Sequence, residues 1–442
     1  SIFVAQVSED ALVAVSIAFP LQMLIIALAL GVGVGTNALI ARRLGEKRRE
    51  EANIAANTGI VLSLINMALC MLVGLFLAKP FVGLFTQDAA VFTMGSQYLM
   101  IVMVFSVGVM IEMTCSRVLQ ATGNMIVPMI SQLIGAITNI ILDPIFIFGY
   151  FGVPKMGVAG AAVATVIGQI LAMIFVLIVL KVGTHEVDIA PWRHHPQMQA
   201  AKDIYRVGIP TFVMNAIGSL TTTAMNAILM GFPRPRGVLG IYFKLQSFLF
   251  MPVNGLNNAL IPIVSFNYGA RQRSRITGVI HFALVLSAAI MAVGTVVFLA
   301  IPGPLLRLFD ADAAVLAEGI SALRLIALSF VCAGVSVILC AALQALGAAN
   351  SSLVVSLLRQ LVLLFPLALL LGALRPSLVW LAFLLSEGAA CLTALLLYRR
   401  TARAGWPVWR NKCPLPTGPE AAAFRPGFFL FKRDFDPTLL TV

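Results

Sequence analysis

The chain has 442 residues, of which 60% are hydrophobic and only 11% are charged, and its mean hydropathy is +0.98. Soluble domains carry about 25% charged residues, so this composition excludes an ordinary soluble protein and indicates a polytopic membrane protein. The net charge of +12 does not indicate nucleic-acid binding, because no basic groove with interleaved aromatic residues is present.

Apolar segments of helix length follow one another along the chain. Crossing the hydrocarbon core takes about 20 residues, and eleven such spans lie near residues 11–41, 53–78, 92–116, 125–149, 158–181, 204–231, 238–266, 276–302, 315–346, 351–374 and 377–398. A polar stretch interrupts the series between the fifth and sixth spans. We therefore expect an N-terminal lobe at 1–182, a linker at 183–203, a C-terminal lobe at 204–400 and a poorly ordered tail at 401–442.

The chain repeats itself, in the same orientation, at a spacing of 224 residues. Leu119–Gly123 (LQATG) returns as Leu343–Gly347 (LQALG), and Pro80–Val91 returns as Pro304–Val315. Parallel repeats of several helices are typical of transporters with a central cavity between two bundles. The offset predicts an all-α membrane protein of two parallel-repeat bundles, six plus six helices, in which residues 1–7 end a first helix that this chain lacks.

Basic residues alternate from loop to loop. Arginines such as Arg42, Arg43, Arg271 and Arg400 belong to the richer set, and the opposite loops hold few. The positive-inside rule then places the richer set, the linker and the C-terminal tail in the cytoplasm, for a multi-pass protein of the cell membrane of a prokaryote. Cysteines and histidines show no CxxC or zinc spacing, so neither an enzyme nor a metal cofactor is expected.

The most informative polar residue inside a span is Asp143. An ionisable group at membrane depth costs about 3 kcal/mol or more, which makes it a functional candidate. Asn139 lies one turn earlier on the same face and Pro144 follows, where it can free backbone carbonyls. Such oxygens suit a proton or Na⁺. Thr165 on the next span either adds a hydroxyl ligand or bonds to its own helix.

Other polar residues within the spans have either a functional or a structural interpretation. Glu112 either contacts a cationic substrate or pairs with Arg117, and Arg359 and Glu387 are expected to form a structural ion pair. Further candidates for the cavity wall are Gln22, Asn57, Lys244, Gln246, Asn257 and Arg324. For the uncharged members, hydrogen bonding between helices is the common alternative, and the two cations can instead extend to the membrane surface.

Several stretches together resemble the multidrug and toxic compound extrusion (MATE) family over nearly all of residues 1–400. They are LIARRLGEKRREEA from Leu39, RVLQATGNMIVP from Arg117, NIILDPIFIF from Asn139, GVAGAAVAT from Gly157, the segment 242–269, and Leu343–Gly347. The resemblance implies two six-helix lobes around a V-shaped cavity and export of bulky organic cations in exchange for H⁺ or Na⁺.

The resemblance also implies an ion site in the N-terminal lobe, onto which Asn139, Asp143 and Thr165 map. The family's first-helix acid would fall just before Ser1. A C-lobe ion site is not expected, because that lobe's corresponding helices offer only Glu318 near an outer end.

The sequence therefore predicts an ion-coupled antiporter. Its expected partners are the lipid bilayer and a small organic cation, it works as a monomer, and H⁺ or Na⁺ at Asp143 replaces any cofactor. The alternative is a flippase for a lipid-linked precursor of the same superfamily, which would favour a strongly basic cavity.

Overall fold

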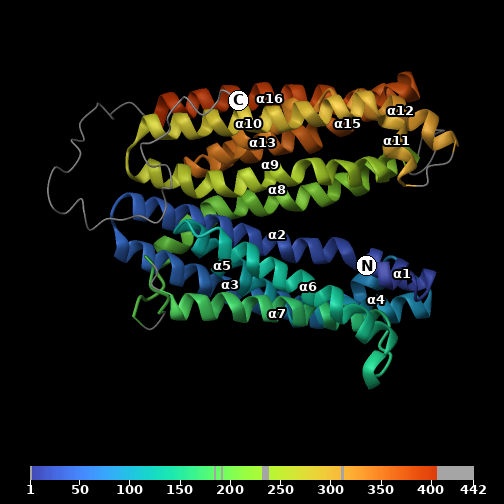
Figure 1. The fold of residues 1–442 in the computed structure, drawn as a ribbon, viewed down its shortest axis with the longest axis horizontal. Helices are drawn as coiled ribbons and strands as arrows, with labels where there is room; N and C mark the ends of the chain where they lie inside the picture. The colour runs from blue at the N-terminus through green and yellow to red at the C-terminus, as the bar shows by residue number, and fades with distance from the viewer. Residues whose placement is uncertain (1, 184–185, 191–192, 231–237, 310–312, 406–442) are drawn as a thin grey trace, which may run out of the picture.

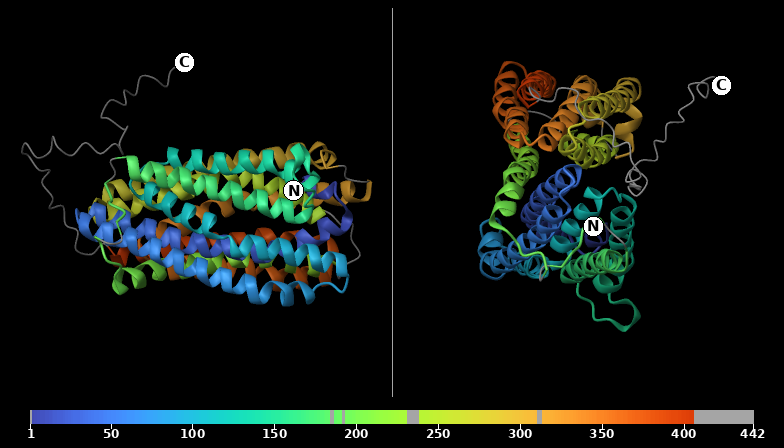
Figure 2. Two further views of the ribbon diagram at one scale, coloured as in Figure 1. Left: turned by 90° about the horizontal axis from the view of Figure 1, so that it is seen from below. Right: turned by 90° about the vertical axis from the view of Figure 1, so that its left-hand side faces the viewer.

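The computed structural model describes residues 2–183, 186–190, 193–230, 238–309 and 313–405, and every regular element within them is helical. The helices run roughly parallel to one long axis and group into two lobes (Figures 1 and 2). Many large apolar side chains face outward, and Phe76, for example, is 72% exposed. Such an outer surface suits lipid, where helices satisfy their own backbone hydrogen bonds. Of the tail predicted at 401–442, residues 401–405 continue the last helix, and the remainder lies outside the described residues.

The N-terminal lobe consists of α1 (Ile2–Ala5), α2 (Glu9–Gly45), α3 (Arg49–Gly83), α4 (Ala89–Val104), α5 (Val107–Ala121), α6 (Ile126–Phe148), the short 3₁₀ helix η1 (Tyr150–Gly152) and α7 (Val158–Val182). Residues 2–5 are a single helical turn, and Ser8 caps α2 by accepting a hydrogen bond from the Ala11 amide at 3.0 Å. The lobe has its own apolar core, which includes Leu99, Met110 and Ile147.

The C-terminal lobe consists of α8 (Met198–Met230), α9 (Val238–Gly269), α10 (Arg273–Ala300), α11 (Pro302–Arg307), α12 (Ala313–Ala327), α13 (Phe330–Ala345), α14 (Ala349–Leu357), the π-helical turn η2 (Leu358–Val362), α15 (Leu364–Leu374), the 3₁₀ helix η3 (Pro376–Trp380) and α16 (Leu381–Gly405). Its core surrounds Tyr242, Phe330 and Trp380. Helix α8 begins inside the segment expected to be linker, because Ala200 and Ala201 favour helix.

Eight helical segments are long and apolar enough to cross a membrane, and two bent helix pairs bring the number to ten in the described residues. The sequence predicts eleven. The difference is α8, which has the length of a span but carries Thr211, Asn215 and Thr221 along its apolar stretch. These residues lower its hydropathy, and α8 packs between α2 and α14, where polar side chains have protein partners.

The backbone confirms the 224-residue repeat. Lys47 and Arg271 both adopt left-handed φ angles, 60° and 57°, in the α2–α3 and α9–α10 turns, and Gly123 and Gly347 do so at 94° and 81°. The bends also correspond, with 43° between α4 and α5 and 47° between α12 and α13. The two lobes are thus copies of one chain path.

The α2–α3 turn, the α9–α10 turn and the linker lie at one end of the molecule, which we call the basic end and which is at the left in Figure 1. Here α2 packs against α8 and α9 of the other lobe. A Cβ atom on Gly45 would collide with the Phe266 carbonyl, and one on Gly269 would collide with the Arg42 carbonyl. Glycine therefore allows the two backbones to touch and closes the basic end.

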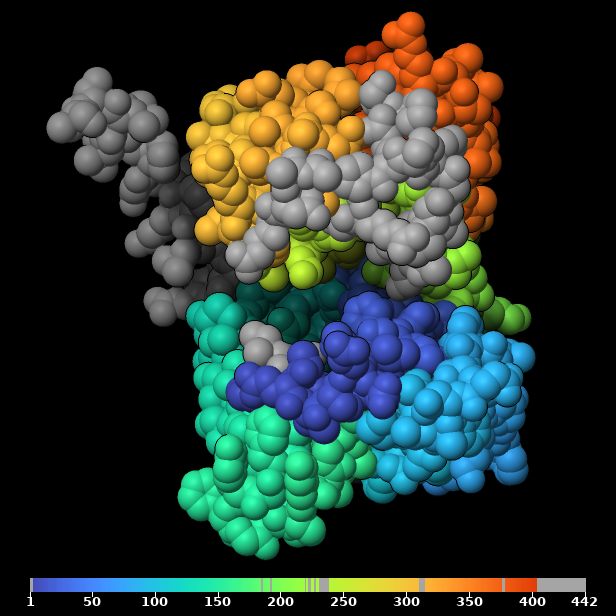
Figure 3. Space-filling model, turned by 90° about the vertical axis from the view of Figure 1, so that its right-hand side faces the viewer, coloured from blue at the N-terminus to red at the C-terminus, as the bar shows by residue number. Residues whose placement is uncertain are grey.

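The two lobes are farther apart at the opposite end, which we call the far end and which carries the α3–α4 and α6–α7 loops. Figure 3 looks onto this end and shows a recess between the lobes. Contact at one end and a recess at the other is the form that a rocking two-lobe transporter takes in one of its two arrangements.

Candidate functional site

Glycine contacts between α6 and α7 position the polar cluster that the sequence predicts. A Cβ atom on Gly168 would lie 2.7 Å from the Gly135 carbonyl oxygen, and one on Gly160 would lie 2.5 Å from that of Phe146. Only a residue without a side chain permits so close an approach. The two helices consequently bring Asn139 of α6 within hydrogen-bonding distance of Thr165 on α7.

Asn139 links Asp143 on its own helix to Thr165 on the next. Its Nδ2 lies 3.3 Å from Asp143 Oδ1 and 3.2 Å from Thr165 Oγ1. The Thr165 hydroxyl in turn donates to the Ala161 carbonyl at 2.9 Å, so it bonds to its own helix and also takes part in the cluster. Asp143 is buried, with 5% of its surface exposed. The structure thus brings all three predicted residues together on two adjacent helices.

Two more polar side chains adjoin this cluster. The Tyr98 hydroxyl of α4 donates to Gln22 Oε1 of α2 at 3.2 Å, and Tyr98 is close enough to Asp143 for an electrostatic interaction. The sequence predicts Gln22 as a cavity residue but does not single out Tyr98. The signal was available, because a tyrosine within an apolar span needs a partner for its hydroxyl.

Glu112 is held by hydroxyl groups. Its Oε1 accepts hydrogen bonds from Ser116 at 2.7 Å and from Ser131 of α6 at 2.9 Å, and the residue is buried. Arg117 directs its guanidinium to Gln120 at 3.0 Å and to Asn258 of the other lobe at 3.1 Å. These hydrogen bonds do not join Glu112 to Arg117, although the two side chains are close enough to interact electrostatically, so contact with a cationic substrate and pairing with Arg117 both stay predictions.

One of the predicted cavity residues has a different role. Asn57 is fully buried in α3, where its Nδ2 donates to the Asn53 carbonyl at 2.8 Å and to the Asp188 carbonyl at 2.9 Å. It fastens the linker to the N-terminal lobe. Asn57 thus has the alternative role of hydrogen bonding between segments, and its place in a cavity wall stays a prediction.

The remaining candidates lie in the C-terminal lobe. Arg359 Nε lies 3.2 Å from Glu387 Oε1, so these two residues form an ion pair. The Lys244 ammonium lies 5.6 Å from the centre of the Phe309 ring. The Asn257 Oδ1 is buried without a hydrogen-bond partner in the described part of the chain. Gln246 is half-buried and Arg324 is exposed, and both remain predictions.

No cluster of three or more His, Cys, Asp or Glu residues suited to a metal ion occurs in the described ranges. A carboxylate inside the membrane, two repeated lobes and a recess between them define a class of protein, the membrane transporters built from parallel repeats.

Comparison with known proteins gives the family. The MatE family model matches residues 1–145 and 210–370, and the chain belongs to this family of transporters. It is similar to "Multidrug export protein MepA" of Staphylococcus saprophyticus subsp. saprophyticus, at 24% identity over 386 residues, 87% of this chain and 84% of that protein. It is also similar to the "FAD transporter" of Shewanella oneidensis, at 25% identity over 83% of this chain and 82% of that one.

A solved structure supports the same assignment. The MATE multidrug transporter DinF-BH, solved as a complex, superimposes with a TM-score of 0.82 and 30% sequence identity, covering 91% of this chain and 90% of that one. The predicted family and two-lobe fold are thereby confirmed.

Proposed function

We propose that this transporter exports organic cations in exchange for H⁺ or Na⁺ and that Asp143 is the coupling residue. The observation that carries the proposal is a buried carboxylate in α6, 5% exposed and hydrogen-bonded through Asn139 to α7. Keeping a carboxylate at membrane depth is costly, so a carboxylate found there is a candidate for a functional role. The names of the relatives, a multidrug export protein and a multidrug transporter, agree with organic substrates.

The charge pattern gives the proposed direction of transport. Under the positive-inside rule the basic end faces the cytoplasm, and the recess at the far end opens outward. An ion that enters from outside and binds Asp143 shifts the equilibrium between the two arrangements by its differential affinity for them. Because the ion also neutralises the carboxylate, it weakens the attraction that holds a cationic substrate, which then leaves outward.

Binding of H⁺ and binding of Na⁺ at Asp143 make different demands on the Asn139 amide. Its Nδ2 faces both Asp143 and Thr165, so donor hydrogens point at the carboxylate. Protonation of Asp143 needs no rearrangement of this amide. Na⁺ needs oxygen ligands, and its binding requires the amide to turn so that Oδ1 faces the ion. Efflux measured with an H⁺ gradient alone and with a Na⁺ gradient alone distinguishes the two ions.

The experiment uses the full chain in proteoliposomes loaded with ethidium, with a pH or Na⁺ gradient imposed across the membrane. We expect Asp143→Asn to abolish gradient-driven efflux while the protein still inserts and stays monodisperse. Asp88→Asn is the matched control, because Asp88 caps α4 outside the apolar stretch and Asn is an equally good cap. Full gradient-driven efflux by Asp143→Asn would refute the proposal.

A flippase for a lipid-linked precursor is the alternative, and it would favour cations gathered in the cavity. In the C-terminal lobe Arg359 is paired with Glu387, and Lys244 lies over Phe309. Of the C-lobe candidates Lys244, Arg324 and Arg359, two are therefore already engaged within their own lobe, which favours the exporter.

A further inference from the structure

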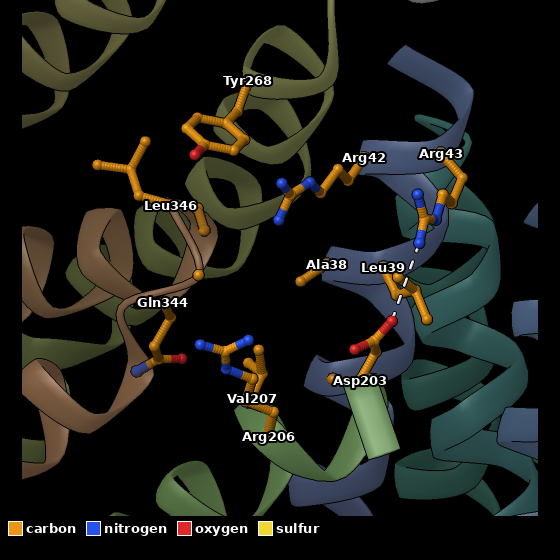
Figure 4. A pocket seen from close by; sticks show the side chains of 13 residues that line it. Ala38, Leu39, Arg42, Arg43, Asp203, Arg206, Val207, Tyr268, Gln344 and Leu346 are labelled. Carbon is orange, nitrogen blue, oxygen red and sulfur yellow. Dashed lines mark ion pairs between the residues drawn. The ribbon is translucent and has the colours of Figure 1, made fainter. Parts of the chain in front are cut away.

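Arginines from both lobes meet at the basic end around a cavity of about 430 Å³. Figure 4 shows Arg42 of α2 and Arg206 of α8 pointing into this space from opposite sides, with Tyr268 of α9 above and Gln344 of α13 beside it. A second cavity of about 460 Å³ shares Arg42, Arg43 and Tyr268 and is lined further by Arg48 and Arg271. Volumes of this size lie in the range of small-molecule sites.

The carboxylates nearby do not balance these arginines. Glu46 is shared by Arg42 at 3.4 Å, Arg43 at 2.8 Å and Arg48 at 4.0 Å. Asp203, the acid on the cavity wall, lies 3.8 Å from Arg43. Glu51 outside the wall serves Arg43 and Arg48.

Arg206 and Arg271 have no ion pair within the described residues. Two guanidinium charges in excess remain at a concave surface, and such a surface concentrates anions.

Arg42 is also held in place. Its guanidinium carbon lies 4.7 Å from the centre of the Tyr268 ring, and its Nε faces Glu46, so the terminal nitrogens stay available on the cavity side. A guanidinium fixed in this way loses little entropy when it binds a phosphate through two parallel hydrogen bonds. Basic residues at a membrane surface are commonly only topology signals, but Arg42 and Arg206, although partly exposed, converge from two lobes on one cavity.

We propose that this cavity is a binding site for a phosphate-bearing anion that bridges Arg42 and Arg206. The shared chemistry is a phosphate group, carried either by an anionic lipid headgroup or by a soluble diphosphate. Basic pockets between membrane helices on the cytoplasmic side are suited to lipid headgroups. Because the two arginines belong to different lobes, the bound anion favours the arrangement in which the basic end is closed. That consequence for transport rests on the proposed function, whereas the site itself does not.

The test measures binding to the purified full chain. Native mass spectrometry detects retained phosphatidylglycerol against phosphatidylcholine, and calorimetry in detergent detects inorganic pyrophosphate. We expect Arg206→Gln to weaken the binding of at least one of these probes about tenfold, the loss typical of one charge-assisted contact. Arg206 is exposed and without an ion pair in the described residues, so its replacement leaves folding intact. Adding Arg42→Gln should lower the affinity about tenfold again.

The matched control for the double variant is Arg399→Gln with Arg400→Gln, two exposed arginines of α16 that line a separate cavity together with Arg403, so the same charge is lost away from Arg42 and Arg206. Retention of phosphatidylglycerol alone identifies a lipid site, and binding of pyrophosphate alone identifies a soluble ligand, and either supports the proposal. Equal losses in the control and in the Arg42 and Arg206 variants, or no binding of either probe to the unaltered chain, would overturn it. Coupled efflux by Asp143→Asn bears only on the proposed function, so the two failures are distinguishable.

Discussion

A methyl group at Gly269 should push the two lobes apart at the basic end. Its Cβ would collide with the Arg42 carbonyl and lie 3.1 Å from the Glu46 amide nitrogen, both backbone atoms that cannot rotate away. Overpacking of this kind costs about 1–3 kcal/mol. The cost falls only on the closed arrangement, because the backbones are separated when the basic end opens. The ratio of open to closed molecules should therefore rise about 5- to 150-fold.

Distances between spin labels measure this shift. In a background without the native cysteines, labels at Lys181→Cys on α7 and Arg400→Cys on α16 report the separation of the two lobes at the basic end, and both positions are exposed. We expect Gly269→Ala to increase the population with the longer distance. The change in helix propensity acts on both arrangements and cancels in their ratio.

The control is Gly278→Ala in α10, where a Cβ atom would meet nothing within 4 Å. It should leave the distance distribution as it is. Gly45→Ala, which brings the same collision from the other lobe, should reproduce the effect of Gly269→Ala. An unchanged distribution in both interface variants would show that the glycine contact does not hold the basic end closed.

Two further predictions concern charged pairs. Removal of one partner from a buried ion pair costs about 3–5 kcal/mol, so Glu387→Gln should lower the thermal stability of the purified protein more than Glu387→Gln combined with Arg359→Met; equal stability of the two variants would contradict this. In the linker, the His194 ring donates hydrogen bonds to the carboxylates of Glu50 at 2.7 Å and Asp188 at 3.4 Å, which raises the pKa of His194 above its ordinary value of 6.5. The stabilisation of linker docking by His194 should be complete below about pH 6.5 and be lost as the pH rises through the raised pKa. Hydrogen exchange of residues 186–190 and 193–197, corrected for intrinsic rates, should therefore quicken with pH in the unaltered chain and not in His194→Gln.

Much of the fold could be predicted from the sequence. Membrane spans are recognised from local composition, and the internal repeat is recognised from its constant spacing. The cluster of Asn139 and Asp143 was also predictable, since residues four apart share a helix face. The position of Thr165 opposite them depends on the close approach of α6 and α7, which the sequence indicates only through the family resemblance.

Contacts between distant segments were not predictable. The role of Asn57 depends on where the linker folds back, and its hydrogen bond to the Asp188 carbonyl spans 131 positions. Arg42 and Arg206 belong to different lobes, and the sequence presents them only as basic loop residues. The shortfall of α8 as a span has a similar origin, because its polar side chains are tolerated by neighbours that come from elsewhere in the chain.

The glycine contact at the basic end has the form of an isologous interface within one chain. Gly45 faces Phe266 while Gly269 faces Arg42. Gly269 stands 224 positions after Gly45, and Phe266 stands 224 positions after Arg42. In a symmetric dimer one residue pair makes both contacts, so a single substitution changes the interface twice. Fusion of two copies into one polypeptide separates these contacts, so each half can change without its twin. The chain can therefore hold a carboxylate site in one lobe and an ion pair in the other, while the two lobes still pack through the same pair of glycine contacts.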